Sequence, residues 1–177
     1  MTNDYLKHRS EVAELTKRLV IYKYPNISEE ERRTWFLAGY LHDIGKEVIE
    51  RRHPGLLEKT DPLTDEEWDI IRRHTQIGFD MLKGSQRKEI SFAAIAALEH
   101  HECWDGSGYM GKTELGISLQ GRVVAVADVY SALCQERPYR KAWNKDLALN
   151  YMKLKSGLLF DPEWVDALMM IEKNGGE

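Results

Sequence analysis

The sequence predicts an all-α fold, a helical bundle formed by a single domain. Apolar residues recur at helical spacing through most of the 177 residues. Two capping-box patterns, Ser28 with Glu31 and Thr64 with Glu67, indicate where helices begin. The nearest candidate for a strand lies at residues 123–127, but its alanines and the length of its apolar run favour a helix. The length fits one domain over residues 1–177, with a core from about 5 to 170.

The first two helices are predicted over residues 5–24 and from Ser28 to about His42. Val12, Leu15 and Leu19 follow helical spacing, and Pro25 ends the pattern. The second helix ends in the sequence FLAGYLHD, which is apolar on almost every side. We therefore expect this end of the helix to be buried.

Residues 45–63 are predicted to form a loop with a short helical turn, because Pro54, Gly55 and Pro62 interrupt the pattern. The helix after Thr64 carries one core-facing stripe: Trp68, Ile71, His74, Gly78 and Leu82. Further helices are expected over residues 89–102, 119–134, 144–155 and 161–173, with a glycine-rich loop before the second of these.

Composition indicates an ordinary globular protein, with 42% hydrophobic and 31% charged residues. The net charge of −4 argues against a basic surface for duplex nucleic acid, so an anionic substrate would meet the local cluster of Arg137, Arg140 and Lys141. Cys103 and Cys134 are not spaced as a disulfide scaffold, which favours a reducing compartment. The chain shows no signal pattern and no membrane-spanning run, so we expect a cytoplasmic protein.

Ionisable residues repeatedly occupy positions where a core residue is expected. His42 and Asp43 end a buried helix, and Asp128 interrupts the apolar run VVAVADVY. A buried charge needs a partner, and Arg122 alone cannot serve all of these groups. A cluster of divalent metal ions can, and imidazole with carboxylate ligands suits iron, manganese, zinc, cobalt or nickel. The residues at such positions are His8, His42, Asp43, His74, His100, His101 and Asp128.

The adjacent pair His42–Asp43 suits a centre with two metal ions. At a helix end both side chains can turn toward one point, so that the imidazole serves one ion while the carboxylate bridges two. Two ions about 3.5–4 Å apart can hold a hydroxide and clamp a phosphate oxygen. This arrangement predicts the hydrolysis of a phosphoester.

Five segments together resemble the HD-GYP family, a branch of the HD-domain phosphohydrolases. The resemblance extends from about His8 to Ala167. The segments are HDIGK from His42, RRHTQIGFDML from Arg72, HHECWDGSGYMG from His100, GRVVAVADVYSAL with RPYRKAW from Gly121, and FDPEWVDAL from Phe160.

The resemblance implies two divalent ions, with iron or manganese favoured, held by the seven residues named above. A third ion would use Asp4, whose side chain is shorter than the family's glutamate. Asp43 and Lys46 are the implied catalytic residues; Lys46 would steady a phosphate oxygen or assist the leaving oxygen. The implied substrate contacts are Lys46, Arg137 and Arg140, with Tyr109, Tyr130 and Tyr139 either stacking on a base or packing in the structure.

The family's usual activity is hydrolysis of cyclic di-GMP to pGpG or GMP by a metal-bridged hydroxide, and related cyclic dinucleotides are also substrates. Three positions depart from its pattern: Met110 replaces the proline of the GYP signature, Ser131 an acidic residue and Thr75 a helix-starting proline. In this family, the loop that corresponds to Gly108-Tyr109-Met110 is associated with contact to the substrate or to a protein partner. The alternatives are another HD-type phosphohydrolase, acting on a different nucleotide or a linear dinucleotide, and a non-catalytic nucleotide- or partner-binding module; the oligomeric state stays open.

Overall fold

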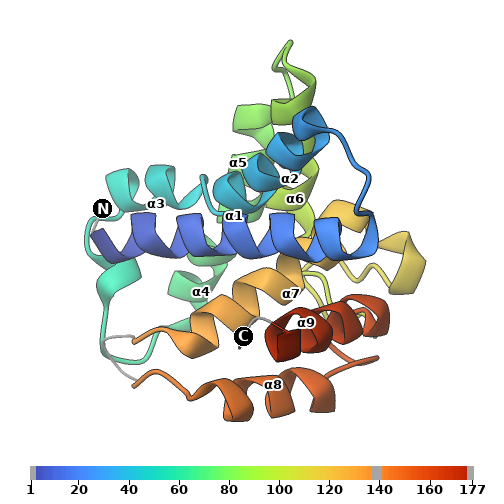
Figure 1. The fold of residues 1–177 in the computed structure, drawn as a ribbon. Coiled ribbons are helices and arrows are strands. Elements are labelled where there is room, and N and C mark those ends of the chain that lie inside the picture. The colour runs from blue at the N-terminus through green and yellow to red at the C-terminus, as the bar shows by residue number, and fades with distance from the viewer. Residues whose placement is uncertain (1–2, 137–140, 175–177) are drawn as a thin grey trace.

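The structure is a computed structural model that describes residues 3–136 and 141–174. These residues form helices and connecting loops without a β-strand, so the predicted all-α fold is confirmed. Helix α1 (Asn3–Lys23) runs across the middle of the molecule (Figure 1). It packs against α2 (Glu29–Leu41), α7 (Leu119–Cys134) and α9 (Pro162–Asn174). On its other side α2 contacts α6 (Lys88–Glu99), which in turn contacts α5 (His74–Leu82). Helix α8 (Lys145–Leu154) packs against α7 and α9.

The core lies where α1, α2, α6, α7 and α9 meet. Leu19, Val126 and Trp164 are among its fully buried side chains. Helices α1 and α2 approach closely at Gly39, where an added Cβ atom would lie 2.7 Å from the Cα atom of Ala13. This close packing holds the end of α2, and the residues that follow it, against α1.

Both capping boxes are present. The Ser28 hydroxyl accepts a hydrogen bond from the Glu31 amide, and the Glu31 carboxylate accepts one from the Ser28 amide. Thr64 and Glu67 make the same reciprocal pair at the start of α4 (Asp65–Arg72). These contacts satisfy amides that a helix start leaves unpaired.

Three of the predicted element boundaries were wrong. The expected loop over residues 45–63 contains α3 (Lys46–Arg52) and the 3₁₀ turn η1 (Leu56–Glu58). Helix α3 has Glu47 in its first turn and Arg51 and Arg52 in its last, charges that complement the helix dipole.

The helix predicted to run from Thr64 to Leu82 is divided at Arg73 into α4 and α5. At this break the Ile71 carbonyl accepts from the His74 ring, and the Arg72 carbonyl accepts from the Thr75 hydroxyl. Helix α6 ends at Glu99, three residues earlier than expected, so His100 and His101 lie in the turn that follows it.

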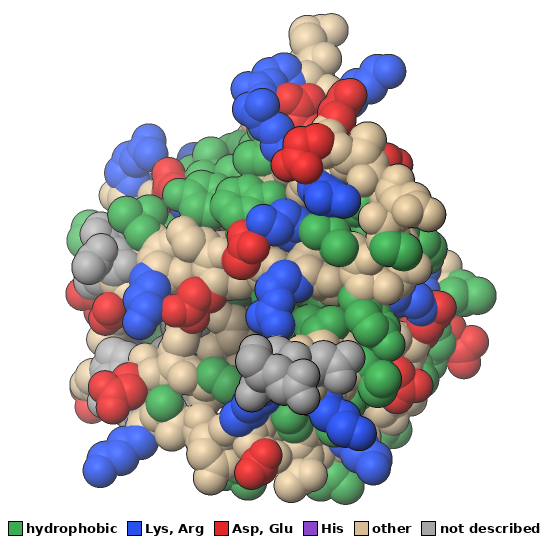
Figure 2. Space-filling model, in the orientation of Figure 1, with side chains coloured by type: hydrophobic (Ala, Val, Ile, Leu, Met, Phe, Trp, Pro, Cys, Tyr) green, Lys and Arg blue, Asp and Glu red, His purple; other side chains and the backbone are tan. Residues whose placement is uncertain are grey.

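The face drawn in Figure 2 mixes basic and acidic side chains without a large field of one sign. None of the helices in the described parts of the chain combines the length and the apolar character required to cross a bilayer.

Candidate metal centre

Five helices and the turns after them bring seven predicted ligands to one buried region. His8 lies on α1, Asp128 on α7, and His74 begins α5. The remaining ligands directly follow α2 or α6: His42, Asp43, His100 and His101. Each helix is fixed by its apolar face, and the ligands project from the ends or sides that meet at the centre.

One group of donor atoms consists of Asp43, His74, His100 and His101, whose ligand atoms all lie within 4.8 Å of one another. The Oδ1 atom of Asp43 lies 3.3 Å from Nε2 of His74 and 3.6 Å from Nε2 of His100. The two Nε2 atoms are themselves 3.3 Å apart. Four donors of these types are sufficient to surround one divalent ion.

A second group consists of His8, His42 and Asp128. The Oδ1 atom of Asp128 lies 2.9 Å from Nε2 of His8 and 3.7 Å from Nε2 of His42. The other oxygen of Asp43, Oδ2, is 3.4 Å from Nε2 of His42. Asp43 therefore has one oxygen beside each group, so its carboxylate could contribute a ligand atom to an ion held by either group.

The histidine rings fit a metal site because their outer nitrogens are held by backbone carbonyls. Nδ1 of His42 lies 2.6 Å from the Gly39 carbonyl oxygen, and Nδ1 of His74 lies 2.6 Å from that of Ile71. A carbonyl only accepts, so Nδ1 carries the proton and Nε2 offers a lone pair to the centre. Nε2 of His42 and Oδ1 of Asp43 are buried, and neither has a hydrogen-bond partner among the residues that the structure describes. Divalent cations would satisfy both atoms.

Burial and charge set the protonation states in the centre. Burial lowers the pKa of His100 to about 4 and holds the pKa of His101 well below its usual value. Burial would raise the pKa of Asp43, but Lys46 and His42 outweigh it and hold this pKa well below the usual range. Neutral imidazoles and ionised carboxylates are the forms that bind metal ions.

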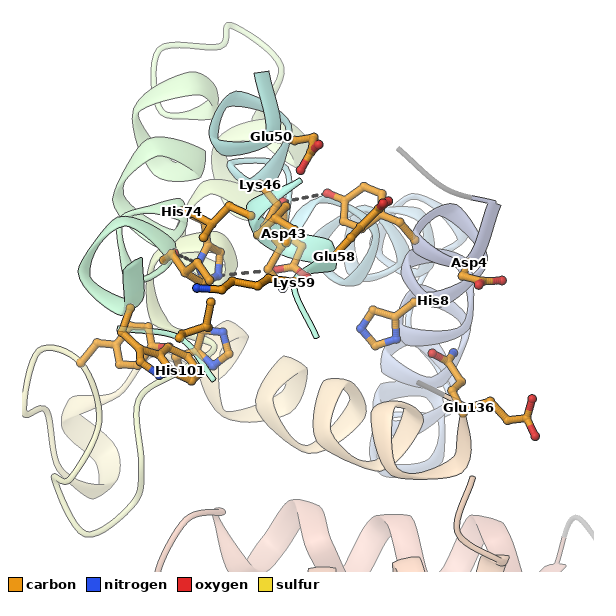
Figure 3. Close-up of a pocket in the computed structure, with 18 residues that line it drawn as sticks. Asp4, His8, Asp43, Lys46, Glu50, Glu58, Lys59, His74, His101 and Glu136 are labelled. Carbon is orange, nitrogen blue, oxygen red and sulfur yellow. Dashed lines mark hydrogen bonds and ion pairs between the residues drawn. The ribbon is translucent and has the colours of Figure 1, made fainter. Parts of the chain in front are cut away.

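A cavity of about 620 Å³ opens onto this centre. In Figure 3, Asp43 lies between His74 on one side and His8 on the other. The Nζ atom of Lys46, which also lines the cavity, is 2.6 Å from Oδ2 of Asp43. A phosphate at the metal centre would therefore have an ammonium group beside it.

The other predicted site residues lie in different places. Asp4 lines the cavity but belongs to neither donor group. Tyr109 also lines it, with its ring centroid 4.8 Å from that of His101. Tyr130 is buried, and its hydroxyl donates to Glu172 on α9. Arg137, Tyr139 and Arg140 lie outside the described residues.

Two supporting residues were missed at the sequence level. The Tyr5 hydroxyl donates to the carbonyl oxygen of Asp43 at 2.8 Å. The buried carboxylate of Glu102 accepts from the Met110 amide at 2.7 Å and from the Lys112 amide at 2.8 Å. Glu102 thus fixes the position of the loop that carries Tyr109. The Met110 bond was unexpected because proline, the family residue there, has no N–H group.

Known proteins that are similar in sequence include phosphohydrolases of the kind that this cluster of histidines and aspartates predicts. A family model described as "HD domain" matches residues 2–164. The chain belongs to the HD-domain family. The predicted resemblance to the HD-domain phosphohydrolases is therefore confirmed.

Two curated relatives of this HD-domain chain are cyclic dinucleotide enzymes by name. The chain is 43% identical over 169 residues to the cyclic di-GMP phosphodiesterase response regulator RpfG of Xanthomonas campestris, covering 95% of this chain and 43% of that protein. It is 35% identical over 133 residues to the 3′3′-cGAMP-specific phosphodiesterase 2 of Vibrio cholerae, covering 75% of this chain and 25% of that one. The HD-domain chain thus spans less than half the length of either relative.

Among solved structures, an HDG"Y"P protein from Bdellovibrio bacteriovorus superposes with a TM-score of 0.70 at 18% identity. The match covers 96% of this chain and 52% of that one. At this identity the likeness supports the shared HD-domain fold.

Proposed function

We propose that the chain is a metal-dependent phosphodiesterase that hydrolyses a cyclic dinucleotide, converting cyclic di-GMP to pGpG or GMP. The observation that supports this most directly is Asp43, whose two oxygens lie beside two separate histidine groups at the floor of a cavity. That geometry suits the two-ion hydrolysis of a phosphodiester. The name of the Xanthomonas relative points to the substrate.

Two ions would be held by the two donor groups, with Asp43 shared between them. Iron or manganese is favoured, and zinc, nickel and cobalt are alternatives that accept the same ligands. Asp4, on the rim of the cavity, is the residue that a third ion would use. When bound, such ions neutralise phosphate charge and lower the pKa of water.

The protein's own groups would orient the substrate and stabilise charge. Lys46 stands beside Asp43 and would donate to a non-bridging phosphate oxygen or to the leaving oxygen. The backbone carbonyls at Nδ1 of His42 and His74 hold both rings in orientation, so the centre needs little rearrangement when substrate arrives. Arg137 and Arg140 are proposed to grip the second phosphate.

The second candidate substrate is another cyclic dinucleotide, 3′3′-cGAMP. The Vibrio relative, named for this substrate, favours it. Both candidates present phosphodiesters between two nucleosides, so the same metal centre would serve either one.

The deciding experiment measures metal content and turnover on the same preparation. The protein, purified without oxygen and loaded with manganese or iron, is incubated with cyclic di-GMP, 3′3′-cGAMP or pGpG, and the products are separated by chromatography. We expect a cyclic substrate to be cleaved faster than the linear one. A fully loaded protein that cleaves neither cyclic dinucleotide would falsify the proposal.

Asp43→Asn tests the bridging role in the same assay. The amide cannot offer a charged oxygen to each group, so metal content should fall and turnover should drop to background. Asp69→Asn is the matched control, because Asp69 is exposed on α4 and lies outside both donor groups. Near-normal turnover by Asp43→Asn would contradict the role.

A further inference from the structure

The segment containing η1 and α4 exposes apolar side chains to the cavity. They do not belong to the main core, whether as fully or as partly buried members. Trp68 and Ile71, predicted to face the core, line the cavity beside the metal centre instead. We call this set the apolar wall; it consists of Leu56, Leu57, Leu63, Trp68 and Ile71.

Trp68 is the largest member of the apolar wall and is 45% exposed. No residue of α4 is buried, so this helix contributes little to the core. The indole of Trp68 therefore keeps a large apolar surface in contact with water inside the cavity. Covering that surface would be favourable, and cavities that bind organic ligands are lined in this way.

An ion pair and a capping box hold the apolar wall in place, and Lys59 of the ion pair also lines the cavity. The Lys59 ammonium pairs with the Glu67 carboxylate at 2.7 Å, joining the end of η1 to α4. Glu67 also forms the capping box at the start of α4 with Thr64. The wall is thus braced before a ligand arrives, which lowers the entropic cost of binding against it.

The apolar wall adjoins the metal ligands directly. The Ile71 carbonyl oxygen lies 2.6 Å from Nδ1 of His74, so the end of α4 contacts a ligand of the first donor group. Trp68 lies one helical turn before Ile71. A molecule with a phosphate at the metal centre would therefore extend a neighbouring group toward the wall within the same cavity.

We propose that the apolar wall, with Trp68 as its platform, is a nucleobase subsite. The inference rests on the proposed function and deepens it, because the planar base, which the ribose joins to the phosphate, is the part of a nucleotide that stacks on an indole. The metal centre and Lys46 recognise the phosphate, whereas the wall distinguishes a nucleotide from a phosphate ester without a ring.

The test measures binding rather than turnover. GMP and inorganic phosphate are titrated separately into manganese-loaded protein by calorimetry. We expect wild type to bind GMP more tightly than inorganic phosphate. Trp68→Ala should weaken GMP binding about tenfold while the affinity for inorganic phosphate stays unchanged. Trp68→Phe, which keeps a ring, should retain most of the GMP affinity.

Leu154→Ala is the control, since Leu154 is 76% exposed on α8 and is absent from the cavity lining. It should change neither affinity. The proposal is overturned if wild type binds GMP no more tightly than phosphate, or if Trp68→Ala weakens both ligands equally. Because the readout does not require hydrolysis, a protein that cleaves no cyclic dinucleotide still shows whether the subsite binds a base.

Discussion

At the scale of single residues, His100 is the buried histidine whose neutral form matters most to stability when metal is absent. His100 is fully enclosed, and burial lowers its pKa from 6.5 to about 4. Between pH 4 and pH 6.5, His100 is therefore protonated in the unfolded chain and neutral in the folded chain. The stabilising contribution is complete above pH 6.5 and is lost as the pH falls toward 4.

The metal-free protein should therefore lose stability in mild acid. Between pH 7 and pH 5, His100 should lower the free energy of unfolding by about 2 kcal/mol. His42 acts in the opposite direction, because Asp43 and Asp128 outweigh its burial and raise its pKa. Comparing wild type with His100→Asn by urea denaturation in chelator isolates the contribution of His100. Equal pH dependence in the two proteins would contradict it.

The same centre shows what residue patterns reveal and what they omit. The positions of His42, Asp43 and Asp128 at the end or in the middle of apolar helices were enough to predict a metal cluster. The pattern suggested that the Asp43 carboxylate bridges two ions, but it could not show which histidines lie beside each oxygen, because they come from helices far apart in the sequence. Tyr5 gave no signal, since its role is a hydrogen bond to a backbone atom.

At the scale of helices and loops, Gly45 allows the segment after His42–Asp43 to lie against α5. A Cβ atom at this position would lie 2.0 Å from the His74 carbonyl oxygen. Gly45→Ala must therefore push α3 and α5 apart, and we expect a loss of about 3 kcal/mol in unfolding free energy, together with weaker metal binding.

Gly84→Ala is the matched control for this substitution. Gly84 follows α5 in a turn, and a Cβ atom added there would have no neighbouring atom within 4 Å, so the free energy of unfolding should change by less than about 0.5 kcal/mol. Thermal denaturation and metal titration measure both effects. If both glycine variants behave alike, the close approach at Gly45 has no energetic importance.

The loop around Tyr109 carries the second prediction at this scale. Met110→Pro restores the family residue but removes the amide that donates to the buried Glu102 carboxylate. We expect a loss of about 1–3 kcal/mol, because a buried acceptor loses a partner. Met110→Ala keeps the amide and should be nearly neutral, since the Met110 side chain is 44% exposed. Chemical denaturation separates the two; a stabilised proline variant would refute the role of the amide.

The helix boundaries show why local patterns predicted the fold better than its details. The capping boxes were correct because a capping box is contained within four residues. The break at Arg73 was missed because Trp68, Ile71 and His74 keep helical spacing across it. The break turns Trp68 and Ile71 toward the cavity, and this change of direction depends on the packing of α4 against α3 and α5.

At the scale of the whole molecule, the candidate metal centre collects side chains from five helices and the turns that follow them. Manganese at about one hundred times its dissociation constant should stabilise the folded state by about 2.7 kcal/mol. For a chain of this size we expect the melting temperature to rise by roughly 5–10 °C. Asp43→Asn should show a much smaller rise. Melting temperatures that do not respond to manganese or chelator would exclude a shared centre.

The long separation between His8 and Asp128 also has a consequence for biosynthesis. These two ligands are 120 residues apart in the sequence, yet their side chains lie 2.9 Å from each other. During translation, α1 is finished long before α7 leaves the ribosome. The second donor group is therefore incomplete while most of the chain is being made. Metal loading of this group would therefore follow the arrival of α7, and an ion held there would mark a chain that has completed its tertiary structure.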